Sequence, residues 1–420
     1  MNMKQTKKYL GAALLAGFLL AAVACTSSSA EDGRRVRIPA PALNEPEALS
    51  AGSAALEFIQ DAKIGWNLGN SFDAWTNGVS SETVWGNPRT TQALLNAVAA
   101  QGFGAVRIPI TWMGHISAGP GYAVETAWLA RVAEVVKYAH NAGLKVIINV
   151  HHDGADSAHW LSINKALANA AGRKGVEQKF EALWLQIAGY FKNHGDYLLF
   201  EGMNEIHDGT WGDGGPAHWA MVNEWNQIFV NAVRSTGGNN VARFLVIPGY
   251  VTRPNLTVAH LQLPEDSAQD RLVVTIHYYD PYEFAIAGTI HKWGEAVPAA
   301  ERNPWGQEDQ ARYTFESVKE RFVDEGIPVI IGEYGAVRQQ GYDPYRKYYM
   351  EYVTKAARDA GMVPFYWDNG AADSGGENFG LFNRASAVVL PAPHDAAAII
   401  AVMMKAVNET YSLSDVVLEP

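Results

Sequence analysis

Two glutamates in the sequence are placed so that a carboxylate pair could cleave a glycosidic bond. Glu205 ends the apolar run "LFEGMNE", and Glu333 comes near the end of "PVIIGEY". Glycosidic cleavage needs one carboxylic acid to protonate the leaving oxygen and one carboxylate to attack the anomeric carbon or to activate water. Either glutamate alone would be interpreted as a surface or salt-bridged residue. Together, each at the end of an expected strand, they indicate a catalytic pair.

The elements that must position this pair alternate regularly from residue 64 onward. Short β-rich apolar runs predict strands at 64–70, 105–110, 145–152, 197–205, 243–250, 272–280, 328–335 and 362–370. Segments of helical periodicity lie between them, such as 90–102, 126–143, 175–194 and 345–361. This α/β pattern predicts a (β/α)₈ TIM barrel, whose active site lies at the C-terminal ends of the strands. The rival fold is an open doubly wound sheet, but no Gly-rich phosphate loop follows the first strand.

Polar and aromatic side chains recur at the ends of the expected strands. Because these ends meet at one mouth of a barrel, the residues there should converge. They are Asn67 and Asn70, Arg107, His151 and His152, Asn204 and Glu205, His277 and Tyr279, Glu333, and Trp367.

Seven motifs occur in order between residues 64 and 384: "GWNLGNSFDAW", "VRIPITW", "NVHHDG", "GMNE", "IHYYDPYEF", "IIGEYG" and "YWDNG". Together they resemble glycoside hydrolase family 5, in the clan of barrels with catalytic glutamates on strands 4 and 7. "ETVWGNPRTT" and "PYEFA" further resemble subfamily 4. The resemblance implies a retaining endo-β-1,4-glucanase, a cellulase or xyloglucanase, that acts on xyloglucan, cellulose or mixed-linkage glucan through a glycosyl-enzyme. It implies no cofactor and no metal.

The resemblance also implies roles for the strand-end residues. Glu205 matches the family's acid/base and Glu333 its nucleophile. Arg107 is expected to hold Glu333 ionised, with Tyr279 donating to the same carboxylate. Asn204 is expected to bind the sugar 2-hydroxyl, where contacts strengthen in the transition state.

The remaining candidates support substrate binding. His151 and His277 match family histidines near the acid and the sugar at the cleavage site, and Trp367 matches the family's sugar-stacking ring. Asn67 belongs to the same strand-end set, while His152 is either a supporting or a core residue. Four loop tryptophans could form further stacking subsites or simply pack: Trp75, Trp211, Trp219 and Trp305.

Three other classes of protein remain as alternatives. A β-mannanase would use the same catalytic machinery, because the carboxylate pair acts at the anomeric centre. A non-catalytic carbohydrate-binding barrel would not need to keep the whole polar set. A zinc hydrolase could use "HHDG" with a third histidine, but the chain lacks the tighter His-x-His pair of such sites.

The N-terminus resembles an export signal. Residues 1–24 combine a lysine-containing start, an apolar run from Tyr9 to Val23 and a small-residue cleavage region, and the apolar run is too short for a membrane span. Cys25, the only cysteine, follows directly and resembles a lipobox cysteine, although Ala22 stands where leucine is usual. The alternative is simple cleavage after Ala30. We therefore expect an exported protein, lipid-anchored to a bacterial membrane or otherwise secreted.

Composition limits the domain organisation and the partners. Residues 25–50 are polar, contain proline and lack apolar periodicity, so they are predicted to be a flexible tether before a single catalytic domain at 51–420. The formal net charge of −11 argues against nucleic acid as a partner. The expected partner is a β-glucan, the only expected membrane contact is the lipid anchor, and the protein is expected to be a monomer.

Overall fold

The computed structural model describes residues 36–49, 54–154, 159–372 and 377–419. The chain divides into Met1–Arg35 and a compact unit, Val36–Pro420. The predicted export signal and Cys25 lie outside the described residues. Every helix and strand of the described residues belongs to the compact unit.

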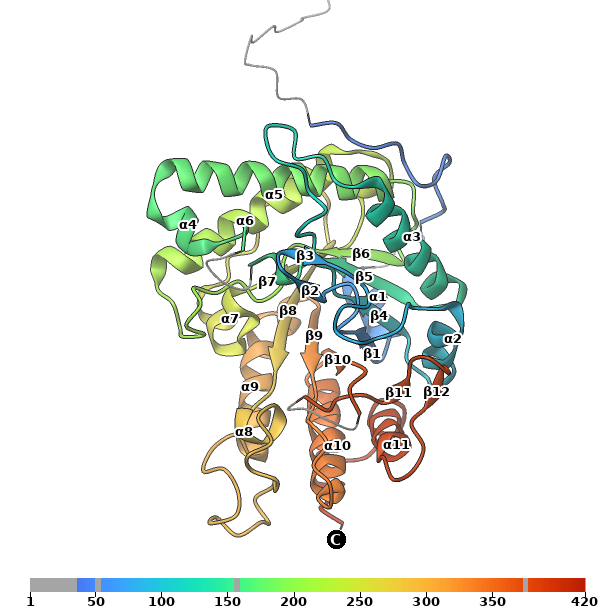
Figure 1. Cartoon of the computed structure of the whole chain (residues 1–420). Helices are drawn as coiled ribbons and strands as arrows, with labels where there is room; N and C mark the ends of the chain where they lie inside the picture. The colour runs from blue at the N-terminus through green and yellow to red at the C-terminus, as the bar shows by residue number, and fades with distance from the viewer. Residues whose placement is uncertain (1–35, 50–53, 155–158, 373–376, 420) are drawn as a thin grey trace, which may run out of the picture. The chain divides into compact units, whose positions relative to one another are not determined.

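Eight parallel strands form a closed barrel (Figure 1). They are β1 (Gly65–Leu68), β4 (Ala105–Ile108), β5 (Lys145–Asn149), β6 (Leu198–Glu201), β7 (Leu245–Pro248), β8 (Leu272–Tyr278), β9 (Val329–Tyr334) and β10 (Val363–Asp368). Each strand pairs with its neighbours in chain order, and β10 returns to pair with β1. The predicted (β/α)₈ barrel and all eight predicted strands are therefore confirmed.

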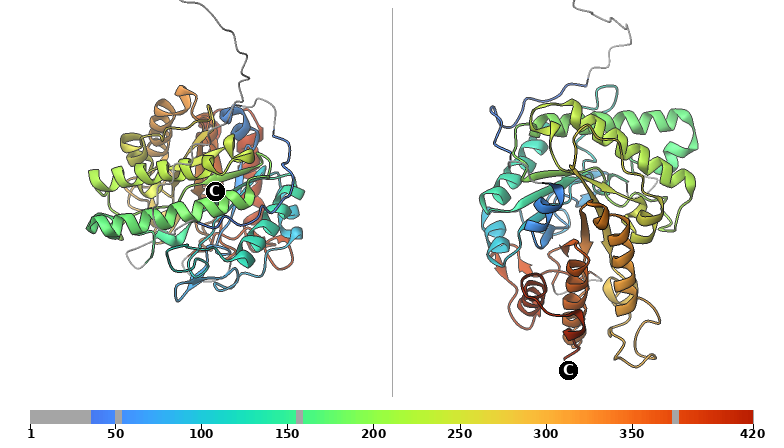
Figure 2. Two further views of the ribbon diagram at one scale, coloured as in Figure 1. Left: turned by 90° about the horizontal axis from the view of Figure 1, so that it is seen from above. Right: turned by 180° about the vertical axis from the view of Figure 1, so that it is seen from behind.

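Helices follow the strands and surround the barrel. They are α2 (Gln92–Ala100), α3 (Thr126–Asn141), α4 (Ile163–Ala168), α5 (Ala170–Phe191), α6 (Pro216–Ser235), α7 (Pro254–His260), α8 (Tyr282–Ala285), α9 (Glu308–Arg321), α10 (Asp343–Asp359) and α11 (Ala396–Asn408). Helices α5 and α6 run side by side (Figure 2). None of the helices in the described part of the chain is long and apolar enough to cross a membrane.

Smaller elements complete the unit. Helix α1 (Ala55–Asp61) precedes the barrel, and two short hairpins are formed by β2 (Trp75–Thr76) with β3 (Val79–Ser80) and by β11 (Phe382–Asn383) with β12 (Val388–Val389). The 3-10 turns are η1 (His152–Gly154), η2 (Gly238–Val241), η3 (Tyr250–Thr252), η4 (Val323–Glu325) and η5 (Leu413–Asp415).

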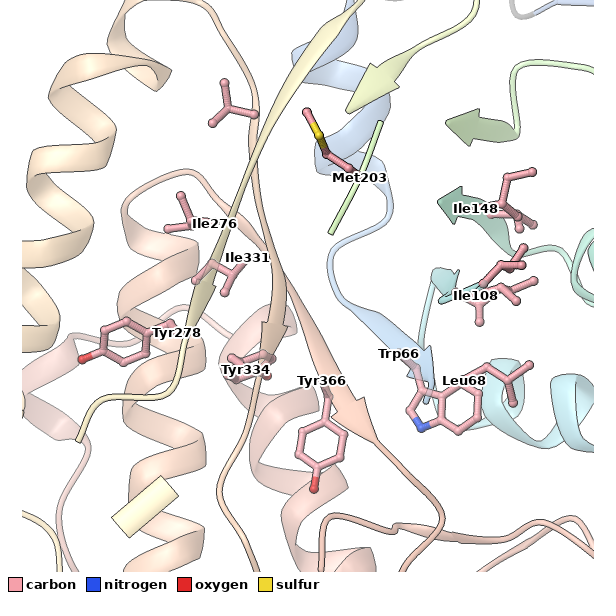
Figure 3. Packing of buried hydrophobic residues seen from close by; sticks show 14 of the residues in the cluster. Trp66, Leu68, Ile108, Ile148, Met203, Ile276, Tyr278, Ile331, Tyr334 and Tyr366 are labelled. Atoms are coloured by element: carbon pink, nitrogen blue, oxygen red, sulfur yellow. The ribbon is translucent and has the colours of Figure 1, made fainter. Parts of the chain in front are cut away.

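Alternation along the strands divides the core into two layers. Trp66, Leu68, Ile108 and Ile148 belong to the layer between strands and helices (Figure 3). The residues between them in sequence face the barrel interior, because successive strand side chains point to opposite faces. At the bottom of the interior lie Ala105, Ile147, Leu199, Val246, Val273, Ile330 and Phe365, packed with Phe58 of α1.

A polar layer stands directly above this apolar plug. Asn67, Arg107, Asn149 and Glu201 each come two positions after an inward residue on β1, β4, β5 and β6, and all four have no exposed surface. The interior of the barrel therefore changes from apolar to polar within one layer, just beneath its mouth.

Residues 36–49 correct the predicted tether at 25–50. This segment contacts the end of α5: Ala42 N donates to Tyr190 O and Glu47 N to Asn193 O, both at 2.8 Å. The Glu47 carboxylate also accepts from Gly195 N at 2.7 Å. The prediction was wrong here because a segment without periodicity can still be ordered when its backbone groups find partners in another element. The compact unit begins at Val36 rather than at residue 51.

Candidate active site

Both predicted catalytic carboxylates lie at the mouth of the barrel. Glu333 is the second-to-last residue of strand β9, as expected. Glu205 does not end its strand, because β6 stops at Glu201 and the next residues form an irregular segment held by Asn204 N donating to Val150 O at 2.9 Å. This segment carries Glu205 over the mouth. One oxygen of Glu205, one of Glu333 and one His277 ring nitrogen all lie within 4.8 Å of one another.

Arg107 is the centre of the hydrogen-bond network below the pair. Its guanidinium is fully buried and donates through Nη1 to Glu333 Oε1 at 2.7 Å and to Asn67 Oδ1 at 3.1 Å. Nη2 donates to Asn204 Oδ1 at 2.8 Å, and Nε donates to Glu201 Oε2 at 2.7 Å. Arg107 therefore fixes the Glu333 carboxylate and the Asn204 amide in one plane of donors.

The second oxygen of Glu333 faces two more polar groups. Tyr279 donates its hydroxyl to Oε2 at 3.1 Å, and His277 Nδ1 lies 3.7 Å from the same oxygen. Burial raises the pKa of Glu333, while His277 and Arg107 oppose that rise. Burial and Glu333 raise the pKa of Tyr279 well above its usual value, so its hydroxyl remains a donor. The direct ion pair with Arg107 favours the ionised form of Glu333.

Glu205 has a different environment, which favours its protonated form. Its Oε1 lies 2.6 Å from His277 Nδ1, and a fifth of its side chain is exposed to the cleft. Burial raises the pKa of Glu205 to about 7, more than Arg107 and His152 lower it. Burial lowers the pKa of His277 to about 4, so this imidazole is neutral. The two carboxyl groups at one mouth therefore differ in their partners, because Arg107 donates to Glu333 whereas Glu205 contacts a neutral imidazole.

The predicted supporting residues converge on the same place. His151 Nε2 lies 3.9 Å from Glu333 Oε1, and the His151 ring is parallel to that of Trp367 at a centroid distance of 6.0 Å. His152 Nδ1 lies 3.1 Å from the carbonyl oxygen of Asp73, and its ring lines the cleft rather than the core. Every predicted strand-end side chain of the site is therefore found at or directly beneath the mouth.

A cleft of about 1320 Å³ opens above these groups and reaches outward over α7 and α9. Of the loop tryptophans considered, Trp211 and Trp305 line it and are about half exposed. The other two do not: Trp75 packs edge-on against His159, and Trp219 stacks on His260 outside the cleft. Trp85, in the loop after β3, also lines the cleft and was not among the predicted site residues, although it lies within the motif "ETVWGNPRTT".

Among the described residues, two groups of side chains are close enough to share a metal ion: Asp73 with His151 and His152, and Glu205 with His277 and Glu333. In the first group, both Asp73 oxygens already accept backbone N–H groups of Asn70 and Ser71, at 3.0 and 2.8 Å. In the second group, Glu333 is paired with Arg107. The carboxylate oxygens that would bind a metal already accept hydrogen bonds from other groups, so the residues fit a metal poorly. That catalysis needs no metal stays a prediction.

Two buried residues of the network were not predicted. Glu201 accepts from Arg107, and Asn149 donates to the same Glu201 oxygen at 2.9 Å and contacts His151 Nδ1 at 3.2 Å. A signal existed in the sequence: a charged residue in an apolar strand, two positions after the inward Leu199.

A parallel barrel with a carboxylate pair of this kind at its mouth is typical of a glycoside hydrolase. The family model described as cellulase (glycosyl hydrolase family 5) matches residues 69–373. Endoglucanase A of Paenibacillus barcinonensis is 40% identical over 79% of this chain and 86% of its own length. The xyloglucan-specific endo-β-1,4-glucanase of Bacteroides ovatus is 36% identical over 81% of this chain and 68% of its own.

A solved structure, a broad-specificity endoglucanase of subfamily 4 from Bacteroides salanitronis, has a TM-score of 0.82 and 46% identity over 86% of this chain and 97% of its own. The chain belongs to glycoside hydrolase family 5. The resemblance found in its motifs is confirmed, and a structure of the subfamily named there is among those most similar to it.

Proposed function

We propose that this protein is a retaining endo-β-1,4-glucanase in which Glu333 is the nucleophile and Glu205 the acid/base. The observation that carries the proposal is the pair itself. An oxygen of Glu205 and an oxygen of Glu333 lie within 4.8 Å of each other across the mouth, and Glu333, unlike Glu205, is paired with Arg107. Retaining enzymes hold their two carboxyl groups about 5–5.5 Å apart, whereas inverting enzymes need a wider gap for water.

In the first step, Glu333 attacks the anomeric carbon while Glu205 gives its proton to the leaving glycosidic oxygen. Arg107 and Tyr279 hold the attacking carboxylate from two sides. Asn204 has its amide oxygen tied to Arg107, which leaves its NH₂ group to donate to the sugar 2-hydroxyl.

In the second step, Glu205 removes a proton from water, which attacks the anomeric carbon and releases Glu333. The environment of Glu205 suits both roles. Burial raises its pKa to about 7 in the free enzyme. Conversion of Glu333 to a neutral ester removes a neighbouring negative charge, which lowers the pKa of Glu205 and makes it a base.

The activity should therefore decline as Glu205 loses its proton. We expect kcat/KM on soluble β-glucan to fall as pH rises through about 7, because the free enzyme needs Glu205 protonated and its pKa is about 7. The measurement is kcat/KM between pH 4 and 10, with thermal melts confirming the fold at each pH. A rate that stays constant up to pH 9 would show that Glu205 is not the acid.

The substrate proposed is an internal β-1,4-glucosidic bond of xyloglucan, cellulose or mixed-linkage glucan. The cleft volume of about 1320 Å³ and the exposed rings of Trp211, Trp305 and Trp85 support a polymer, because aromatic faces stack on sugar rings. The named activities of the relatives also support it. A β-mannanase remains the second candidate, since the pair at the anomeric centre does not select among the other hydroxyls.

Initial rates of the soluble enzyme on xyloglucan, barley β-glucan, carboxymethylcellulose and mannan test this proposal, each with and without EDTA. We expect hydrolysis of at least one glucan, weak or no hydrolysis of mannan, and no effect of EDTA. A rate lost in EDTA would indicate a metal-dependent hydrolase, and no glucan activity at all would indicate a binding barrel.

We propose in addition that the protein is exported and that Cys25 carries a lipid, with the catalytic unit acting as a monomer. The support for export and lipidation is the sequence of the N-terminus, which lies outside the described residues. In the bacterial host, wild-type protein should fractionate with membranes, and Cys25→Ser should move it to the soluble fraction. An equal distribution of the two proteins would favour simple cleavage after the signal.

A further inference from the structure

Glu201 is a buried carboxylate for which the double displacement has no use. It ends β6, beneath the mouth, and has no exposed surface. Arg107 Nε and Asn149 Nδ2 both donate to its Oε2, at 2.7 and 2.9 Å. Its Oε1 has no hydrogen-bond partner among the described residues. A buried carboxylate with an unpartnered oxygen destabilises the fold, so a contribution to packing alone does not account for it.

Arg107 shares its single positive charge between two carboxylates. The Nε to Glu201 and Nη1 to Glu333 distances are the same, 2.7 Å, and the side chains of Arg107 and Glu201 are fully buried. Water therefore screens these charges little. In consequence, Glu333 faces a guanidinium that Glu201 has already neutralised in large part, and it keeps more of its nucleophilic character than it would beside an unpaired arginine.

The value of this sharing appears when the glycosyl-enzyme forms. The bond from Glu333 to the anomeric carbon is made, the bond to the leaving oxygen breaks, and Glu205 gives that oxygen a proton. Glu333 becomes a neutral ester. Without another carboxylate, Arg107 would then be a buried, unpaired cation below a sugar ring that carries positive charge in the transition state, an arrangement that costs free energy.

We propose that Glu201 is a positioning residue that keeps Arg107 electrically paired throughout the reaction, so that Glu333 can lose its charge without leaving a bare cation beneath the sugar. The inference rests on the proposed function and assigns a role to a residue outside the sugar-contacting set.

The other groups around Glu333 do not replace Glu201. They are Arg107, His151, His277, Tyr279 and Glu205. Burial lowers the pKa of both histidines, to about 4 for His277, so both are neutral. Tyr279 is a neutral donor. Arg107 is therefore the cation that Glu333 faces, and Glu201 is the carboxylate that balances it when Glu333 is esterified.

The test is Glu201→Gln, which keeps the shape and an acceptor for Arg107 but removes the charge. We expect kcat/KM on β-glucan to fall about 30- to 100-fold, because both transition states lose a compensating negative charge. Both limbs of the pH profile should also move to lower pH, by about half a unit to one unit. Glu333 then feels the whole charge of Arg107, and Glu205 loses the charge of Glu201 that raises its pKa.

Two variants separate this electrostatic role from a structural one. Glu201→Asp restores the charge with a shorter side chain, so its pH limbs should stay near those of the wild type and its rate should exceed that of Glu201→Gln. Glu82→Gln is the matched control, since Glu82 is a buried carboxylate paired with Arg131 at 2.8 Å and does not line the cleft. It should leave both pH limbs unchanged.

The inference would be overturned if folded Glu201→Gln had the kcat/KM and the pH profile of the wild type. It would also be overturned if Glu201→Gln and Glu201→Asp lost equal amounts of kcat/KM while both limbs of their pH profiles stayed in place. If Glu201→Gln does not fold, ¹³C-carboxyl NMR of the wild type decides, with the signal assigned through Glu201→Asp. The Glu201 carboxyl signal should keep one chemical shift in the free enzyme and after trapping with a 2-fluoro cellobioside, and a change between the two states would contradict the role. A wild-type enzyme without glucanase activity would instead overturn the proposed function.

Discussion

Glu333→Ala should lower the hydrolysis of β-glucan by about 10⁵-fold or more, because no other group can form the covalent intermediate. The fold should survive, since Arg107 keeps its ion pair with Glu201 at 2.7 Å when Glu333 is removed. The measurement is the initial rate on soluble β-glucan together with the thermal midpoint. An activated aryl cellobioside with added azide should give the α-glycosyl azide, because azide enters the space that Glu333 vacates.

The control for this experiment is Glu177→Ala, which removes a carboxylate from the outer surface of α5, where it pairs with Arg173 at 2.9 Å. It should keep wild-type rates. If Glu333→Ala retained more than a few per cent of activity, or if the azide product had the β-configuration, Glu333 would not be the nucleophile.

Glu205→Ala should give a different pattern, in which the effect depends on the leaving group. Hydrolysis of β-glucan should fall by about 10³- to 10⁴-fold, because a sugar leaves poorly without a proton donor. A dinitrophenyl cellobioside needs no proton to leave, so its first step should remain fast and the glycosyl-enzyme should accumulate as a burst. The pH limb near 7, which reflects the pKa of Glu205, should disappear.

Azide distinguishes the two glutamates again. With Glu205→Ala it should speed turnover of the activated substrate and yield the β-glycosyl azide, since it attacks the glycosyl-enzyme from the face where water normally enters. Glu205→Gln is a second variant for this test, because it keeps a polar group beside His277. In the wild type, His277 Nδ1 lies 2.6 Å from Glu205 Oε1. Equal losses on activated and natural substrates in both variants would argue for a structural role of Glu205.

Much of the site could be predicted from the sequence because parallel strands in a closed barrel end at one mouth. Once eight βα units were recognised, Arg107, His277 and Glu333 could be placed together although they are far apart in the chain. The position of Glu205 was predicted less accurately, because the sequence run continues past the point where β6 leaves the ladder at Glu201.

The residues that were missed depend on contacts between elements. Residues 36–49 have no periodic pattern, and hydrogen bonds with the end of α5, the residues after it and Asn239 of η2 give them an ordered path. Trp85 reaches the cleft while Trp219 stacks elsewhere, and both are tryptophans in or beside loops. Loop paths are set by packing against neighbours, so residue type alone does not decide which ring faces the substrate.

The sequence by itself determined the α/β barrel and the family and singled out the two candidate glutamates, because strand alternation, helical periodicity and motif order are local properties of the chain. Only the tertiary structure decided which carboxyl group is paired with a cation. Both are glutamates near the end of an apolar run, yet Arg107 donates to Glu333 while Glu205 contacts a neutral His277. It also revealed Glu201 as the second partner of Arg107, since a shared counterion is a property of three side chains from three strands, β4, β6 and β9, brought within hydrogen-bond distance.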